Sequence, residues 1–165
     1  MSRCESERYT VDHASGTRRG VGEDAYARQS GSHPDPAPPA PLALGVDLVE
    51  VARIGNALRR HPVRFLTRHF TAVEREQCGA DPARLAARWA AKEAAAKALG
   101  TGIGAVRWTD LEVVCDPRGT PRLRLHGHAG AKAEALRLAA WSVSLTHTAG
   151  HALAVVAALA APDAE

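Results

Sequence analysis

The pattern of apolar and polar positions predicts that the first regular element of the chain is a strand. In the stretch LALGVDLVE, Leu44, Val46 and Leu48 alternate with glycine, aspartate and valine, which predicts a strand with one buried face. Residues 51–61 then carry apolar side chains at helical spacing. Pro62 opens the short segment PVRFLTRHF. The chain therefore passes from a strand into a helix.

Two further helices have recognisable starts. Thr71 and Glu74 have the spacing of a capping box, which predicts a short helix ending near Gly79. Asp81 can cap the next helix, and the proline that follows it occupies the favoured first position. This helix is predicted over residues 82–99 and stops at a glycine. It is alanine-rich and is the longest helix in the prediction.

The second half of the chain has a different pattern. Residues 110–116 and 121–127 are predicted as short strands joined by PRGT, a hairpin turn. Residues 128–139 are predicted as a helix. Residues 141–148 and 151–159 are predicted as two more strands, although the alanine content of the second is also compatible with a helix. The order of strand, helices, hairpin, helix and hairpin indicates an α+β domain.

The N-terminal residues show neither the helical nor the strand repeat of apolar side chains. Residues 1–41 are polar and end in the proline-rich SHPDPAPPAP, so we expect a disordered tail with a stiff linker, followed by one domain at 42–162. No apolar run is long enough to cross a membrane. The charged N-terminus does not resemble a secretory signal. The three cysteines, Cys4, Cys78 and Cys115, are widely spaced. With no membrane span and no secretory signal, this spacing favours a reduced, cytoplasmic protein.

The surplus of positive over negative side chains lies in the predicted domain and not in residues 1–41. The chain has a net charge of +3, with five Arg against six acidic residues in 1–41 and sixteen Lys or Arg against twelve acidic residues in 42–165. This surplus is compatible with an acidic partner or a phosphorylated substrate.

One strand and one helix carry residues suited to metal and phosphate chemistry. Asp47 lies within a predicted strand, where aspartate is disfavoured. Trp89, Glu93 and Lys97 share one helix face, and the surrounding alanines would let this helix approach the strand closely. Two carboxylates brought together suit Mg²⁺, and a lysine beside them suits a phosphate. The alternatives are an edge or capping role for Asp47 and an exposed Glu93–Lys97 ion pair.

Two other stretches allow several interpretations. GTGIG, residues 100–104, is either a helix end with a flexible turn or a backbone loop that approaches a phosphate. SVSLTHT places hydroxyls beside His147, which suits phosphate or nucleotide binding. A serine nucleophile lacks the expected strand-to-helix elbow. Zinc at His147 and His151 lacks a cysteine pair.

These stretches together resemble the 4′-phosphopantetheinyl transferases, in the short holo-acyl-carrier-protein synthase branch. GVDLVEVARI, RWAAKEAAAKALGTGI, DLEVVCDPRGTPRL and SVSLTHT…HALAVV occur in the family's order and spacing, over roughly residues 42–160. Both family signatures, G-(I/V)-D-(I/L)-V-E and (F/W)-A-x-K-E-A-x-x-K-A-L-G, are intact. The resemblance implies one long helix on a small antiparallel sheet, and a homotrimer with its sites between subunits.

The resemblance also implies an activity. Such enzymes move the phosphopantetheine arm of coenzyme A to a serine of an apo acyl carrier protein and release adenosine 3′,5′-bisphosphate. The family's Mg²⁺ ligands fall on Asp47 and Glu93, which with Lys97 form the expected catalytic group. The proton acceptor is hypothesised to be Glu93 or a metal-bound water. Arg53 matches a position used against the acidic carrier. The expected coenzyme A contacts are Arg88, Lys97, Gly100, Ser144, His147 and Thr148.

Three alternative functions remain open at this point. The chain could be a broad-specificity transferase for polyketide or peptide carriers. It could be a non-catalytic carrier-binding module, although such a module would predict a damaged metal pair. A nucleic-acid-binding protein is disfavoured, because no basic stripe and no aromatic stacking platform stand out. No membrane partner is expected.

Overall fold

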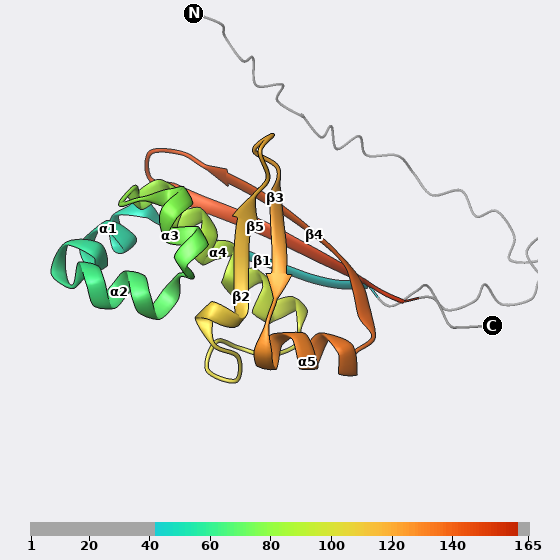
Figure 1. Ribbon diagram of the computed structural model, residues 1–165. Coiled ribbons are helices and arrows are strands. Elements are labelled where there is room, and N and C mark those ends of the chain that lie inside the picture. Colours follow the sequence, from blue (N-terminus) through green and yellow to red (C-terminus); the bar gives the residue numbers. More distant parts are fainter. Residues whose placement is uncertain (1–41, 162–165) are drawn as a thin grey trace, which may run out of the picture. The chain divides into compact units, whose positions relative to one another are not determined.

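The computed structural model describes residues 42–161, and the elements there follow the predicted order (Figure 1). The tail predicted at 1–41 and the last residue of the predicted domain lie outside the described residues. The elements are β1 (Leu42–Glu50), α1 (Val51–Arg60), α2 (Pro62–His69), α3 (Ala72–Cys78), α4 (Pro82–Ala98), η1 (Trp108–Asp110), β2 (Leu111–Cys115), β3 (Pro121–Leu125), α5 (Gly127–Ala135), β4 (Leu138–His147) and β5 (His151–Ala160).

A three-stranded antiparallel sheet and the helix α4 form the centre of the domain. The strand order is β1-β5-β4, and α4 packs mainly across β1 and β5. The strands β2 and β3 form a separate antiparallel hairpin. The α+β class with one long helix on a small antiparallel sheet is therefore confirmed. Among residues 42–161, no helix is both long and apolar enough to cross a membrane.

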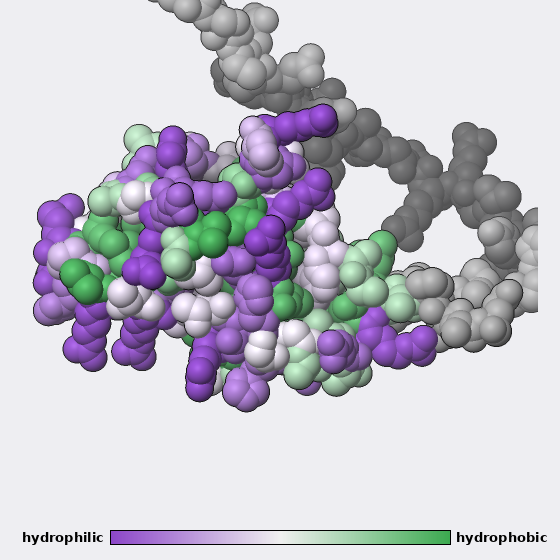
Figure 2. Space-filling model, viewed as in Figure 1, coloured by the Kyte–Doolittle hydropathy of each residue, from purple (hydrophilic) through white to green (hydrophobic). Residues whose placement is uncertain are grey.

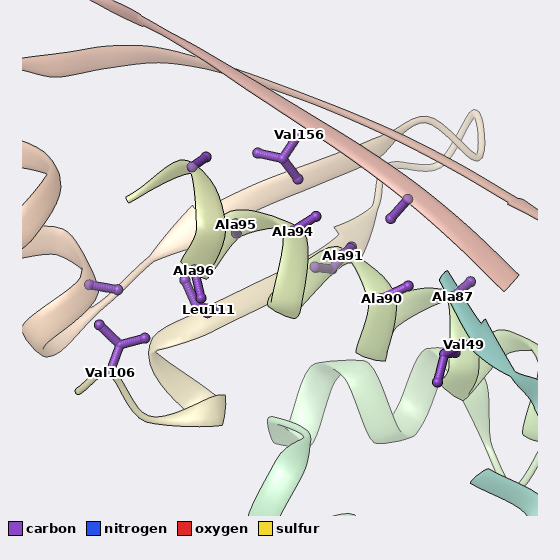
Figure 3. Close-up of a cluster of buried hydrophobic side chains, with 14 of the residues drawn as sticks. Val49, Ala87, Ala90, Ala91, Ala94, Ala95, Ala96, Val106, Leu111 and Val156 are labelled. Carbon is purple, nitrogen blue, oxygen red and sulfur yellow. The ribbon is translucent and has the colours of Figure 1, made fainter. Parts of the chain in front are cut away.

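The alanine-rich segment near the C-terminus is a strand and not a helix. It forms β5, the central strand, whose buried face carries Ala152, Ala154, Val156 and Ala158. Figure 3 shows the alanines of α4 lying between Val156 on one side and Leu111 and Val106 on the other. Small side chains on both elements let helix and sheet approach closely, which explains the alanine content of both.

Close approach also explains a glycine in β1. A Cβ atom at Gly45 would lie 1.8 Å from the carbonyl oxygen of Ala94, far inside contact distance. This part of the interface therefore requires glycine. The next residue on the same face of the strand is Asp47, so the contact at Gly45 brings the Asp47 carboxylate toward α4.

Most of the large apolar side chains of β1 point away from the helix. The strand was correctly predicted, but the face packed on α4 carries Gly45 and Val49, whereas Leu44, Val46 and Leu48 are 52–60% exposed. Alternation identifies two faces of a strand, and the helix selects the face with the smaller residues because it packs so closely.

Most of the predicted helix ends are confirmed. The Thr71–Glu74 capping box is confirmed, and the Asp81 side chain accepts hydrogen bonds from the first turn of α4. The helix predicted at 128–139 was too long. It ends at Ala135, because Arg137 has a φ of 57° that ends the helical path, and Leu138 already belongs to β4.

Candidate functional site

The structure brings the two predicted metal ligands together. Asp47 projects from β1 toward α4, and Glu93 lies on the facing side of that helix. Burial raises the pKa of Glu93, and the nearby charge of Asp47 raises it further, while Lys97 and Arg53 oppose the shift. Two neighbouring carboxylates are a donor set that suits Mg²⁺, with waters and substrate oxygens completing the coordination.

Lys97 makes contacts that its helix position does not reveal. Its Nζ donates to Oδ1 of Asp47 at 2.8 Å and to the carbonyl of Val46 at 2.8 Å. The sequence placed Lys97 on one face with Glu93, as the structure shows, but its ion-pair partner comes from β1. The lysine thus crosses from α4 to the strand.

An aromatic cluster lies on the same side of α4 as Glu93. Trp89, one helical turn before Glu93, packs on Trp108 with ring centroids 4.0 Å apart and stacks on Phe65 at 5.8 Å. The guanidinium of Arg53, from α1, lies 5.9 Å from the Trp89 ring centre. This cluster fixes the side of α4 that carries Glu93 and sets Arg53 beside it.

The neighbouring residue Lys92 has a role that sequence analysis missed. It is fully buried, and its Nζ donates to Glu74 at 2.7 Å and to the carbonyl of Trp108 at 2.8 Å. Burial lowers the pKa of Lys92, and the Glu74 carboxylate opposes that shift. Glu74 also accepts from the backbone N–H of Val113 and from that of Thr71. Only the capping box hinted at Glu74, and no local pattern indicated its pairing with Lys92.

A second candidate region is a cavity of about 500 Å³ beside β4, which we call the cationic cavity because its basic side chains outnumber its one carboxylate, Asp116. Arg84 and Arg88 from α4 line it together with His147, at the end of β4. Two hydrogen bonds position Arg88: its Nε donates to the carbonyl of Val113 at 3.1 Å, and its Nη2 donates to Gln77 at 3.2 Å. Three basic side chains around one cavity suit a phosphorylated ligand.

Four of the six predicted coenzyme A contacts do not line this cavity. One of them is Lys97, which pairs with Asp47 instead. Ser144 is exposed on the opposite face of the sheet from His147. The hydroxyl of Thr148 accepts hydrogen bonds from the N–H groups of Gly150 and His151 within the β4–β5 turn. Gly100, with a φ of 65°, ends α4 and borders a different hollow. Within one chain, Arg88 and His147 line the same cavity, and the other four predicted contacts lie elsewhere.

A basic groove lies on the surface of α1 and α2. It has a volume of about 330 Å³ and an apolar floor of Ala57 and Phe65, with Arg60, Arg64 and Arg68 around it. Figure 2 shows hydrophilic side chains projecting from the surface over these two helices. Arg53 lies on α1, which also lines this groove. Basic side chains therefore extend along α1 from the groove toward Glu93, on which the charge of Arg53 acts.

The family model and the most similar relatives point to the same protein family. The model of the 4′-phosphopantetheinyl transferase superfamily matches residues 43–156. A holo-acyl-carrier-protein synthase of Herpetosiphon aurantiacus is 48% identical over 122 residues, covering 70% of this chain and 96% of the relative.

Solved structures agree with the sequence matches. The holo-acyl-carrier-protein synthase of Helicobacter pylori, solved in complex with coenzyme A, has a TM-score of 0.64 and 32% identity, covering 70% of this chain and 98% of that one. The Bacillus anthracis synthase, solved in complex with CoA (3′,5′-ADP), has a TM-score of 0.60 and 31% identity, covering 72% of this chain and 96% of that one.

Proposed function

Because this chain belongs to the 4′-phosphopantetheinyl transferase superfamily, in its holo-acyl-carrier-protein synthase branch, we propose that it modifies an acyl carrier protein from coenzyme A in a Mg²⁺-dependent reaction. The phosphopantetheine arm moves to a serine hydroxyl, and adenosine 3′,5′-bisphosphate leaves. The observation that carries the proposal is the meeting of Asp47 and Glu93 with Lys97 beside them. A non-catalytic module would have no need of this pair.

The residues around the pair have distinct roles in the proposed transfer. Mg²⁺ on Asp47 and Glu93 supplies positive charge to the diphosphate when bound. The serine oxygen forms a bond to the β-phosphorus as the bridging P–O bond breaks. Lys97 donates to the diphosphate oxygens on which charge develops. The serine proton would be accepted by Glu93 or by a water on the metal.

The cationic cavity is proposed to hold the nucleotide end of coenzyme A. Arg84, Arg88 and His147 supply the charge for its phosphate groups. This cavity and the carboxylate pair are on different sides of α4, since Arg88 and Glu93 are five residues, or about 140°, apart around the helix. His147 and Asp47 likewise come from the two outer strands of the sheet.

A homotrimer would resolve this separation. In such an assembly, the cavity of one subunit would face the carboxylate pair of the next, and a single coenzyme A would span both. The exposed apolar face of β1 supports association, since Leu42, Leu44, Val46 and Leu48 lie there together with Leu159 of β5. Ser144 lies on the same outer face of the sheet and would then approach the neighbouring subunit.

The acyl carrier protein is proposed to dock on α1 and α2. Its acidic surface would meet Arg53 and the basic groove, whose apolar floor offers a contact for a carrier side chain. The carriers in question are those of fatty-acid, polyketide or peptide synthesis. Free Cys78 and Cys115 fit a reduced, cytoplasmic setting.

Replacing Glu93 by glutamine tests the metal site. Glu93→Gln removes a charged ligand without changing size, so we expect kcat/KM for transfer to fall by about 100-fold or more, with the thermal midpoint unchanged. Glu134→Gln, on the exposed side of α5, is the matched control and should retain full activity. Full activity in Glu93→Gln would contradict the proposed metal role.

Charge reversal on α2 tests the carrier surface. We expect Arg64→Glu to weaken binding of a carrier protein, whose acceptor serine is replaced by alanine, by about tenfold, because it repels an acidic partner. Coenzyme A binding, measured by calorimetry, should not change. Arg53→Glu should also weaken carrier binding more than coenzyme A binding. Equal losses for both ligands would place the carrier elsewhere. Arg118→Glu at the exposed β2–β3 turn is the control.

A further inference from the structure

Lys97 occupies the position on Asp47 that a cation would take. Its Nζ lies 2.8 Å from Oδ1 of Asp47, and the carbonyl of Val46 accepts a second hydrogen bond at 2.8 Å. The lysine side chain is 51% exposed, while that of Asp47 is only 19% exposed. The ammonium group therefore covers a carboxylate that has little other access to solvent.

The charges around the pair nearly cancel without any metal. Asp47 and Glu93 contribute two negative charges at most, and Lys97 and Arg53 contribute two positive charges that both act on Glu93. A divalent cation entering alone would make this region strongly positive, and it would displace the ammonium from Asp47. A cation bound to a diphosphate brings its own compensating negative charge.

We propose that Lys97 keeps free divalent metal off Asp47, so that the site takes the metal as a complex with the diphosphate of coenzyme A. The inference rests on the metal site proposed above. On binding, Lys97 exchanges its hydrogen bond to Asp47 for one to a diphosphate oxygen. Lysine suits this exchange, since its ammonium is a compact charge on a flexible stem.

The exchange makes the binding of metal and coenzyme A cooperative. Diphosphate draws Lys97 away from Asp47 and so raises the affinity of Asp47 for metal. By linkage, metal raises the affinity for coenzyme A by the same factor. Without Lys97 the two ligands would bind more independently, and the free protein would bind metal more tightly.

Titration with Mn²⁺ tests the inference without any turnover. Free Mn²⁺ is followed by electron paramagnetic resonance, with the full-length protein and no coenzyme A. We expect Lys97→Met to bind Mn²⁺ at least about fivefold more tightly than the unmodified chain, from the loss of one ion pair and one cation repulsion. Lys132→Met, an exposed lysine on α5, should leave the affinity unchanged. Equal or weaker binding by Lys97→Met would overturn the inference.

A second substitution separates this inference from the metal site itself. Asp47→Asn in the Lys97→Met background should abolish the added Mn²⁺ affinity. With coenzyme A present, and a protein-free titration subtracted, Asp47→Asn alone should also lose Mn²⁺ binding. If Asp47→Asn binds Mn²⁺ as well as the unmodified chain in that arm, the proposed metal site is wrong. If only Lys97→Met fails to tighten binding, the site stands and the role of Lys97 is wrong.

Discussion

Adjacent residues Lys92 and Glu93 project from different sides of α4 and make different contacts. Glu93 faces Asp47, whereas Lys92 is sealed in the core against Glu74 and the carbonyl of Trp108. This buried ion pair joins α3, α4 and η1, and Glu74 also holds Val113 of β2. It fixes the rotation of α4 about its axis, and so the direction of Glu93.

The buried pair predicts a large loss of stability when it is broken. Lys92→Met leaves the Glu74 carboxylate buried without its cation, so we expect the free energy of unfolding to fall by about 3–5 kcal/mol in urea denaturation. Adding Glu74→Gln to it should recover part of that loss, because the uncompensated charge is gone. Lys132→Met should change stability by less than about 0.5 kcal/mol. An unchanged midpoint for Lys92→Met would show that the pair does not stabilise the fold.

The same residues show how far sequence analysis reached. The Thr71–Glu74 box and the Asp81 cap were predicted because their partners lie within a few residues in the chain. The pairs Lys92–Glu74 and Lys97–Asp47 join residues 18 and 50 positions apart, and only the packed fold specifies them. Asp47, Glu93 and Lys97 were identified as candidates from their types, their spacing and the family resemblance, and their roles stay predictions.

At the scale of elements, the close contact between β1 and α4 brings Asp47 toward Glu93. The alanines of α4 and Gly45 of β1 remove the side chains that would hold the two elements apart. The sequence predicted that alanines would allow this approach. It did not predict which face of β1 would be used, since alternation alone does not distinguish a face covered by a helix from one that is left exposed.

Gly45→Ala tests this contact. The new methyl would sit 1.8 Å from the Ala94 carbonyl, and a helix backbone cannot give way as a flexible side chain would. We expect a loss of about 3 kcal/mol or more in unfolding free energy. Gly102→Ala is the control, since nothing lies within 4 Å of a Cβ built there. Equal stability of the two variants would contradict the close packing of α4 on β1.

At the scale of the whole molecule, the sheet has an outer face that is apolar and exposed in the single chain. Leu42, Leu44, Val46 and Leu48 are each more than half exposed in the single chain. A face of this kind is unfavourable in water, and a second copy of the chain is the occupant that would also complete the coenzyme A site. The trimer stays a prediction that follows from family membership and from this face.

Leu44→Asp tests the assembly. A charge in the middle of the outer face should shift the mass measured by light scattering from trimer to monomer, since burying an unpaired carboxylate is costly. Transfer activity should fall with it, because each site would lose its neighbour's cavity. Val73→Asp, exposed on α3, is the control for an added surface charge. A monomeric unmodified chain with full activity would refute a shared site.

The most direct test of the whole account is the intact mass of an apo acyl carrier protein after incubation with this protein, coenzyme A and Mg²⁺. We predict a gain of one phosphopantetheine on the carrier serine, and no gain when EDTA removes the metal. No gain with any fatty-acid, polyketide or peptide carrier, or an equal gain in EDTA, would contradict the proposed Mg²⁺-dependent transfer.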